Sequence, residues 1–213
     1  LPAAVGLLLD VLQKRQRILI VADYDADGAT SCALGILGLK ALGFPHVDFL
    51  VPNRFEFGYG LTPAIVEVAL AQKPDLLMTV DNGIASHAGV ELARAHGMRV
   101  LITDHHLPEA QLPPALAVIN PNRPDCTYPN KNLCGAAVAF KLAQALMARQ
   151  GWPETKLRRM LESFLKLVAV ATVADVVSLT GENRALTKLG LDSFTEVRNI
   201  GLKELLRVSG IEE

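Results

Sequence analysis

Short apolar runs that alternate with longer helical patterns are the feature that most limits how this chain can fold. Apolar runs of strand length occupy residues 17–22, 46–52, 75–81, 98–104 and 116–121. The segments between them carry apolar residues at helical spacing over 29–43, 61–72 and 86–97. Strands that alternate with helices of this length are typical of βαβ units. We therefore predict an α/β fold, with a parallel β-sheet flanked by helices.

The pattern becomes almost entirely helical from Gly135 onward. Apolar stripes at helical spacing run through residues 135–150, 154–176 and 182–194. We therefore divide the chain into an α/β part, residues 1–134, and a mostly helical part, residues 135–213. The first thirteen residues predict an amphipathic helix, because they lack the basic lead and small-residue cleavage site of a signal peptide.

Composition excludes some functions and restricts others. Half of the 213 residues are hydrophobic, which is enough for a large core, but no run approaches the roughly 18–20 apolar residues of a membrane span. Three cysteines without CxxC spacing indicate reduced thiols and a cytoplasmic protein. The net charge of −1 gives no global field for nucleic acid. The basic clusters at 14–17 and 156–159 are more typical of solvated helix faces.

Acidic residues and histidines follow three of the predicted strands. The segment DYDAD (23–27) follows the first strand, DNG (81–83) the third, and DHH (104–106) the fourth. Ligands of open parallel sheets collect at the carboxyl ends of the strands, so we expect these segments to share one crevice. We also expect the chain to turn at Asp27–Gly28, which would leave two of the three aspartates of DYDAD as ligands.

Such a crowd of carboxylates needs compensation. Like charges raise one another's pKa or recruit cations, and carboxylates with imidazole suit Mn²⁺ or Mg²⁺. Two ions roughly 3.5–4 Å apart, bridged by one carboxylate, would neutralise the cluster. An isolated DxD is often a helix cap, and an isolated pair of histidines is often a surface feature. Their joint placement at strand ends favours a metal centre.

Asp175 interrupts the otherwise apolar segment 167–179 of the helical part. A buried carboxylate without a partner would cost several kcal/mol. Asp175 is therefore either a cap at the end of a helix or a further metal ligand that reaches the crevice from the helical part. We favour the second interpretation.

Four segments in order carry a family resemblance. They are ADYDADGATS (22–31), VDNGI (80–84), TDHH (103–106) and ATVADVVSL (171–179). Together they resemble the DHH phosphoesterase superfamily, and within it the RecJ-type exonucleases, which digest single-stranded DNA from 5′ to 3′. Two signatures of that branch also occur, VPNRFEFGYGL (51–61) and NPNRP with KNLCGAAVAFKL (120–142).

The resemblance implies specific roles for residues at the crevice. The implied metal ligands are Asp25, Asp27, Asp81, His105 and Asp175, with Asp81 bridging two divalent ions, Mn²⁺ or Mg²⁺. With Asp81, His106 would be catalytic, by stabilising charge on the scissile phosphate or by donating a proton. Asp104 would orient its neighbours. Asp23 would be a second-sphere residue or a substitute ligand, because Val21 stands where related enzymes carry a histidine ligand.

The resemblance also suggests contacts with substrate. Arg54, Arg123 and the amides near Gly135 are expected to hold phosphates, although either arginine could equally form an ordinary surface salt bridge. Stacking on bases, or packing under the loop, is expected of Phe55, Phe57 and Tyr59.

The function implied is metal-dependent phosphodiester hydrolysis, by a 5′–3′ single-stranded-DNA exonuclease of DNA repair and recombination that releases mononucleotides. Its partners would be single-stranded DNA and a single-strand-binding protein. Alternatives are a nuclease for short RNA, a cyclic-dinucleotide phosphodiesterase, an inorganic pyrophosphatase, or a non-catalytic scaffold of replication. The signatures at 51–61 and 120–142 disfavour the other enzymes, and the retained acids and histidines disfavour the scaffold.

The family's DHHA1-type and OB-fold regions do not occur in these residues. The chain therefore resembles a catalytic core whose residues 201–210 lead toward the next domain. We expect feeble or distributive activity from this part on its own.

Overall fold

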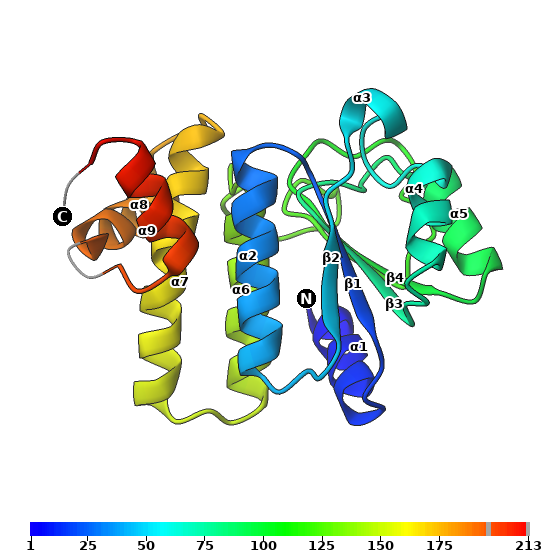
Figure 1. The fold of residues 1–213 in the computed structure, drawn as a ribbon, viewed down its shortest axis with the longest axis horizontal. Helices are drawn as coiled ribbons and strands as arrows, with labels where there is room; N and C mark the ends of the chain where they lie inside the picture. The colour runs from blue at the N-terminus through cyan, green and yellow to red at the C-terminus, as the bar shows by residue number, and fades with distance from the viewer. Residues whose placement is uncertain (195–196, 212–213) are drawn as a thin grey trace.

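The computed structural model describes residues 1–194 and 197–211. Within them, five parallel strands form one sheet in the order β2-β1-β3-β4-β5. The strands are β1 (Ile18–Ala22), β2 (Val47–Leu50), β3 (Leu76–Val80), β4 (Arg99–Thr103) and β5 (Ala117–Ile119). Helices cover both faces of the sheet (Figure 1), which confirms the predicted α/β fold.

Each face of the sheet has its own hydrophobic core. The helices α1 (Pro2–Gln13), α2 (Ala26–Ala41) and α6 (Gly135–Arg149) pack on one face, and α4 (Pro63–Leu70) and α5 (His87–Ala95) on the other. Alternate residues of β1 serve the two cores: Ile20 points into the first and Val21 into the second. Burial on both faces explains why the central strands are continuous apolar runs.

The helical part continues the first of these cores. It comprises α6, α7 (Glu154–Ala174), α8 (Gly181–Asp192) and α9 (Ile200–Val208). Phe164 and Val168 of α7 belong to the same core as Ile20 of β1, and α8 packs on α7. The change of secondary structure at residue 135 is as predicted. The division into two domains stays a prediction, because the two parts share one core.

The polar residues at helix starts decide where the helices begin. Thr62 caps α4 by accepting from the amide of Ile65, and Pro63 occupies the first turn. The start predicted for α2 is wrong by three residues. The carboxylate of Asp25 accepts from the amide of Gly28 at 2.9 Å, so the helix already begins at Ala26.

The turn expected at Asp27–Gly28 is therefore wrong as well, because both residues lie in the first turn of α2. Gly28 is needed for a different reason. A Cβ on it would lie 2.4 Å from the carbonyl oxygen of Asp23, so the helix start packs on the chain that precedes it. A short helix, α3 (Arg54–Phe57), was not predicted, although Asn53 caps it.

The structure also allows the prediction about membranes to be checked. Across residues 1–194 and 197–211, no helix combines the length and the apolar character needed to cross a bilayer.

Candidate metal centre

The site lies where the connections leave the sheet in opposite directions. From β1 the chain passes to β2 on one side, and β3 lies on the other side of β1. Such a switch point leaves a crevice beyond the carboxyl ends of the two central strands. The strand register places Ala22, Val80 and Thr103 side by side. The next residues, Asp23 and Asp81 and Asp104, therefore meet at one edge, as the sequence predicted.

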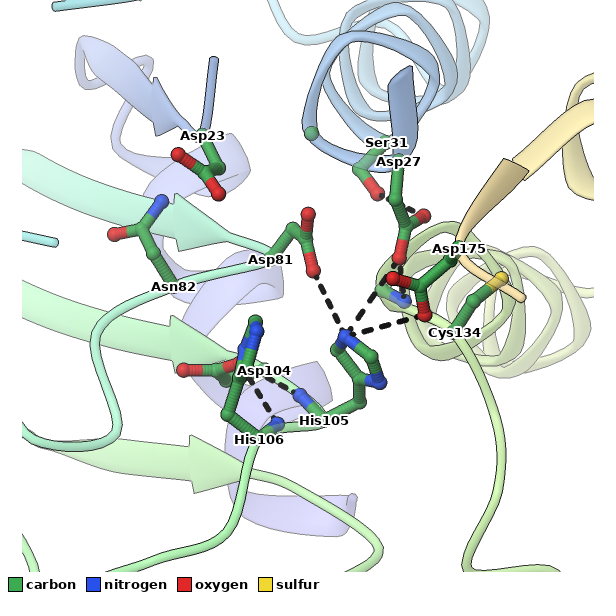
Figure 2. Close-up of polar contacts among 12 residues, drawn as sticks. Asp23, Asp27, Ser31, Asp81, Asn82, Asp104, His105, His106, Cys134 and Asp175 are labelled. Atoms are coloured by element: carbon green, nitrogen blue, oxygen red, sulfur yellow. Dashed lines mark hydrogen bonds and ion pairs between the residues drawn. The ribbon is translucent and has the colours of Figure 1, made fainter. Parts of the chain in front are cut away.

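His105 lies among three of the other predicted ligands (Figure 2). Its Nε2 is 3.2 Å from Oδ1 of Asp81, 3.7 Å from Oδ2 of Asp175 and 3.8 Å from Oδ2 of Asp27. Two of these atoms, His105 Nε2 and Asp81 Oδ1, are buried and have no hydrogen-bond partner among the described residues. Buried polar atoms are normally paired, so this geometry fits a site for a cation.

A second group of oxygens adjoins the first. Asp23, Asp25 and Asp81 each offer a carboxylate oxygen, and these atoms lie within 4.8 Å of one another. Asp81 therefore belongs to both groups, as a ligand that bridges two ions would. Its backbone is left-handed, with a φ of 63°. This conformation costs a non-glycine residue about 1–2 kcal/mol and often occurs at functional sites.

Asp27 is held by the start of α6. Its two carboxylate oxygens accept from the amides of Gly135 at 2.5 Å and Ala136 at 2.8 Å. We expected the amides near Gly135 to hold a phosphate, but in this structure they orient Asp27 instead. The positive end of a helix favours a carboxylate for the same reason that it favours phosphate.

Asp175 reaches the site from the end of α7. It is the C-terminal capping residue of that helix, and its carboxylate faces His105 (Figure 2). Its placement thus agrees with both interpretations offered by the sequence, an end of a helix and a candidate ligand. Burial raises the pKa of Asp175, and the carboxylates of Asp27 and Asp25 add to this effect.

Asp104 binds its neighbours and turns away from the ligand cluster. Its oxygens accept from the amide of Ile84 at 2.8 Å, the amide of His105 at 2.7 Å and Nδ1 of His106 at 2.7 Å. Burial alone would raise the pKa of Asp104, but the hydrogen bond and charge of His106 lower it on balance. The same bond raises the pKa of His106. The contacts are those of a residue that orients the two histidines.

The raised pKa values of the clustered carboxylates also favour the binding of cations. Burial, followed by the charges of Asp27 and Asp25, raises the pKa of Asp81 to about 10. Burial also raises the pKa of Asp27, against the amides of Ala136 and Gly135. Carboxylates in such a place must bind either protons or metal ions. The donor set of oxygens and one imidazole suits Mn²⁺ or Mg²⁺.

The two arginines predicted to hold phosphate are both engaged by carboxylates. Arg54 donates to Oδ1 of Asp23 at 2.9 Å, while its buried Nε has no partner within the described residues. Arg123 forms a double ion pair with Asp125 and donates to the carbonyl of Val118. Arg54 therefore keeps a donor from which a phosphate could accept, and phosphate binding by either arginine stays a prediction.

The three aromatic residues of the 51–61 signature have different surroundings. Phe55 is 90% exposed, whereas Phe57 packs against the core formed by α4 and α5. The hydroxyl of Tyr59 lies 3.3 Å from the His106 ring nitrogens. Burial and the surrounding carboxylates raise the pKa of Tyr59, so it keeps its proton.

Several asparagines of the site were missed by sequence reasoning. Asn122 and Asn120 donate from their side chains to the carbonyls of His105 at 2.6 Å and His106 at 2.8 Å. Asn82 donates to the carbonyl of Val21 at 3.1 Å, which ties the ends of β1 and β3 together. In the segment NPNRP only the arginine was predicted to have a role, although asparagine side chains often form hydrogen bonds with backbone groups in loops.

Replacement of Gly135 by alanine is expected to disrupt the site. A Cβ at this position would lie 2.5 Å from Oδ1 of Asp81 and 2.7 Å from its Cβ. Overpacking of this kind costs about 1–3 kcal/mol, which urea unfolding would measure, and Mn²⁺ uptake should fall as Asp81 is displaced. Gly6→Ala is the matched control, because nothing lies within 4 Å of its added Cβ and alanine stabilises a helix by about 0.5–1 kcal/mol. Unchanged stability and Mn²⁺ uptake in Gly135→Ala would contradict this geometry.

Comparisons with known proteins find relatives that are similar in sequence and in fold. The single-stranded-DNA-specific exonuclease RecJ of Escherichia coli is 49% identical over 97% of this chain. A crystal structure of exonuclease RecJ bound to manganese superposes with a TM-score of 0.85 and 39% identity, over 97% of this chain and 51% of that one. RecJ of Thermus thermophilus in complex with Mn²⁺ gives a TM-score of 0.81 and 37% identity, over 98% of this chain and 29% of that one.

The matches cover this chain almost completely but only part of its relatives. The chain spans 37% of the length of the Escherichia coli protein. The model of the DHH family, N-terminal domain, matches residues 17–172, which contain every strand of the sheet and the cluster around His105 apart from Asp175. The chain belongs to the DHH family.

Proposed function

We propose that this chain is the catalytic part of a metal-dependent phosphodiesterase that degrades single-stranded DNA from its 5′ end and releases mononucleotides. The observation that carries the proposal is the convergence of Asp27, Asp81, His105 and Asp175 on one point, where two buried polar atoms lack a partner among the described residues. The 49% identity to a single-stranded-DNA-specific exonuclease supports the choice of substrate.

The residues present fit two divalent ions. Asp27, His105 and Asp175 would hold one, Asp23 or Asp25 the other, and Asp81 would touch both. When bound, such ions make hydroxide available near neutral pH and neutralise charge that develops on phosphate. Two similar structures are named as manganese complexes, which supports Mn²⁺ as the probe, and another is named as a Mg²⁺ complex.

His106 supplies a further charged group beside this cluster. Asp104 binds its Nδ1, so Nε2 is the nitrogen that remains for other contacts. An imidazole in this position can stabilise charge on a phosphoryl oxygen or give a proton to the leaving oxygen. Asp104 prepares it for either role by favouring the protonated ring.

A substrate panel tests the proposal. We expect Mn²⁺-dependent release of labelled mononucleotide from 5′-labelled single-stranded DNA, abolished by EDTA, with the matching duplex and the 3′-labelled strand releasing no early mononucleotide. Preferential cleavage of dinucleotides, cyclic dinucleotides or pyrophosphate would overturn the substrate assignment. If no substrate is cleaved, bound Mn²⁺ decides. Stoichiometric uptake would mean that further parts of the protein are needed, whereas no uptake would favour a non-catalytic scaffold.

Two attributes remain part of this proposal. Cys32, Cys126 and Cys134 form no disulfide in the described chain, which supports a reducing, cytoplasmic location. Association with a single-strand-binding protein stays a prediction from the family resemblance.

A further inference from the structure

The loop that carries Tyr59 directs its side chain toward the candidate metal centre. Gly58 and Gly60, on either side, have φ values of 78° and 77°, a conformation that glycine adopts without strain. The loop is anchored on the far side, where the amide of Leu61 donates to the hydroxyl of Ser86 at 2.9 Å. The phenol ring is consequently directed toward the end of β3 and the DHH segment.

The Tyr59 hydroxyl makes contacts with two parts of the candidate metal centre. It lies 3.3 Å from both Nδ1 and Nε2 of His106, and 3.4 Å from the carbonyl oxygen of Asp81. The two rings meet edge to face, with centroids 5.8 Å apart and an interplanar angle of 76°. Since Asp104 lies only 2.7 Å from Nδ1, Nε2 is the nitrogen available to Tyr59.

We propose that Tyr59 is a positioning residue, whose hydroxyl holds the His106 imidazole with Nε2 beside the metal centre. A phenol can donate one hydrogen bond and accept others. It can therefore donate to Nε2 of the neutral ring, whose proton is on Nδ1, or accept from Nε2 of the protonated ring while donating to the carbonyl of Asp81. With Asp104 at one nitrogen and Tyr59 at the other, the orientation of His106 is fixed from both sides.

This role differs from the stacking of Tyr59 on a base. The residue is 52% exposed, so its ring could also face a substrate, and a phenylalanine in its place would keep that surface. Tyr59→Phe therefore isolates the hydroxyl. Tyr128→Phe is the matched control, because its hydroxyl bonds to Glu182 at 2.8 Å, outside the proposed site.

The first test does not require activity. The side-chain nitrogen chemical shifts of His106 and His105 would be recorded for the metal-free protein and its two Tyr→Phe variants by NMR. We expect the His106 shifts to move in Tyr59→Phe and to remain unchanged in Tyr128→Phe, with folding retained in both. His106 shifts that are the same in Tyr59→Phe as in the original chain would overturn the proposal.

The second test rests on the proposed function and uses Mn²⁺-dependent cleavage of single-stranded DNA. Loss of a hydrogen bond that orients a site histidine typically costs 10–100-fold, so kcat should fall by about this factor in Tyr59→Phe, with KM and Mn²⁺ uptake preserved. In a His106→Gln background the same change should cost less than about twofold, because the effect runs through His106. A raised KM with unchanged kcat, or equal losses in both backgrounds, would refute the positioning role. Absence of cleavage by the original chain would count against the proposed function only, and the NMR result would still decide the role of Tyr59.

Discussion

Replacement of Asp81 by asparagine is expected to abolish metal-dependent cleavage of single-stranded DNA. Asp81 is the residue shared by the two groups of candidate ligands, and an amide has one acceptor oxygen where the carboxylate has two. Metal ions contribute several kcal/mol to the stabilisation of such transition states. We therefore expect kcat/KM to fall roughly a thousandfold or more, as measured by release of labelled mononucleotide.

Asp48→Asn provides the control for this experiment. It makes the same chemical change on an exposed residue of β2, and its activity should equal that of the original chain. Bound Mn²⁺ would be counted in all three proteins, and Asp81→Asn should lose at least one ion. Cleavage by Asp81→Asn within tenfold of the original rate would contradict the assignment of Asp81 as the shared ligand.

Addition of Mn²⁺ is expected to raise the melting temperature by several degrees. A ligand at a hundred times its dissociation constant stabilises the folded state by about 2.7 kcal/mol. For a protein of this size, that corresponds to a shift of roughly 5–11 °C. Thermal unfolding with EDTA and with Mn²⁺ would measure the shift. It should be small in Asp81→Asn and complete in Asp48→Asn.

The stability of the metal-free protein is expected to fall as pH rises. Burial and the charges of Asp27 and Asp25 raise the pKa of Asp81 from 3.8 to about 10, so the folded state holds a proton that the unfolded state releases. This contribution is fully present below about pH 4 and is lost progressively up to about pH 10. Asp81→Asn should flatten the dependence, and Mn²⁺ should stabilise more at pH 8 than at pH 6 because it displaces the proton. A pH dependence that is the same in Asp81→Asn would contradict this account.

The fold could be predicted from the sequence because local and long-range signals agree. The five apolar runs became the five strands, and their bounds differ by only one or two residues at most ends. Proline at the start of α4 and the cap at Thr62 fixed that helix. The order of strands in the sheet could not be read from the apolar pattern, because each central strand is buried on both faces and periodicity does not identify its neighbours.

The candidate site was predicted in its composition but not in all its contacts. Carboxylates and histidines at strand ends can be predicted to share a site, because parallel strands bring their carboxyl ends to one edge of the sheet. The bond from Gly135 to Asp27 involves a backbone amide, which every residue except proline carries and no sequence pattern marks. Ion pairing of Arg54 with Asp23 depends on the unpredicted helix α3.

The most direct test of a two-ion centre at Asp81 is anomalous diffraction at the manganese edge, from crystals of the protein grown with Mn²⁺. We predict two peaks roughly 3.5–4 Å apart, one beside Asp27, His105 and Asp175 and the other beside Asp23 or Asp25. The carboxylate of Asp81 should contact both. A single peak, or peaks that Asp81 does not touch, would contradict the account.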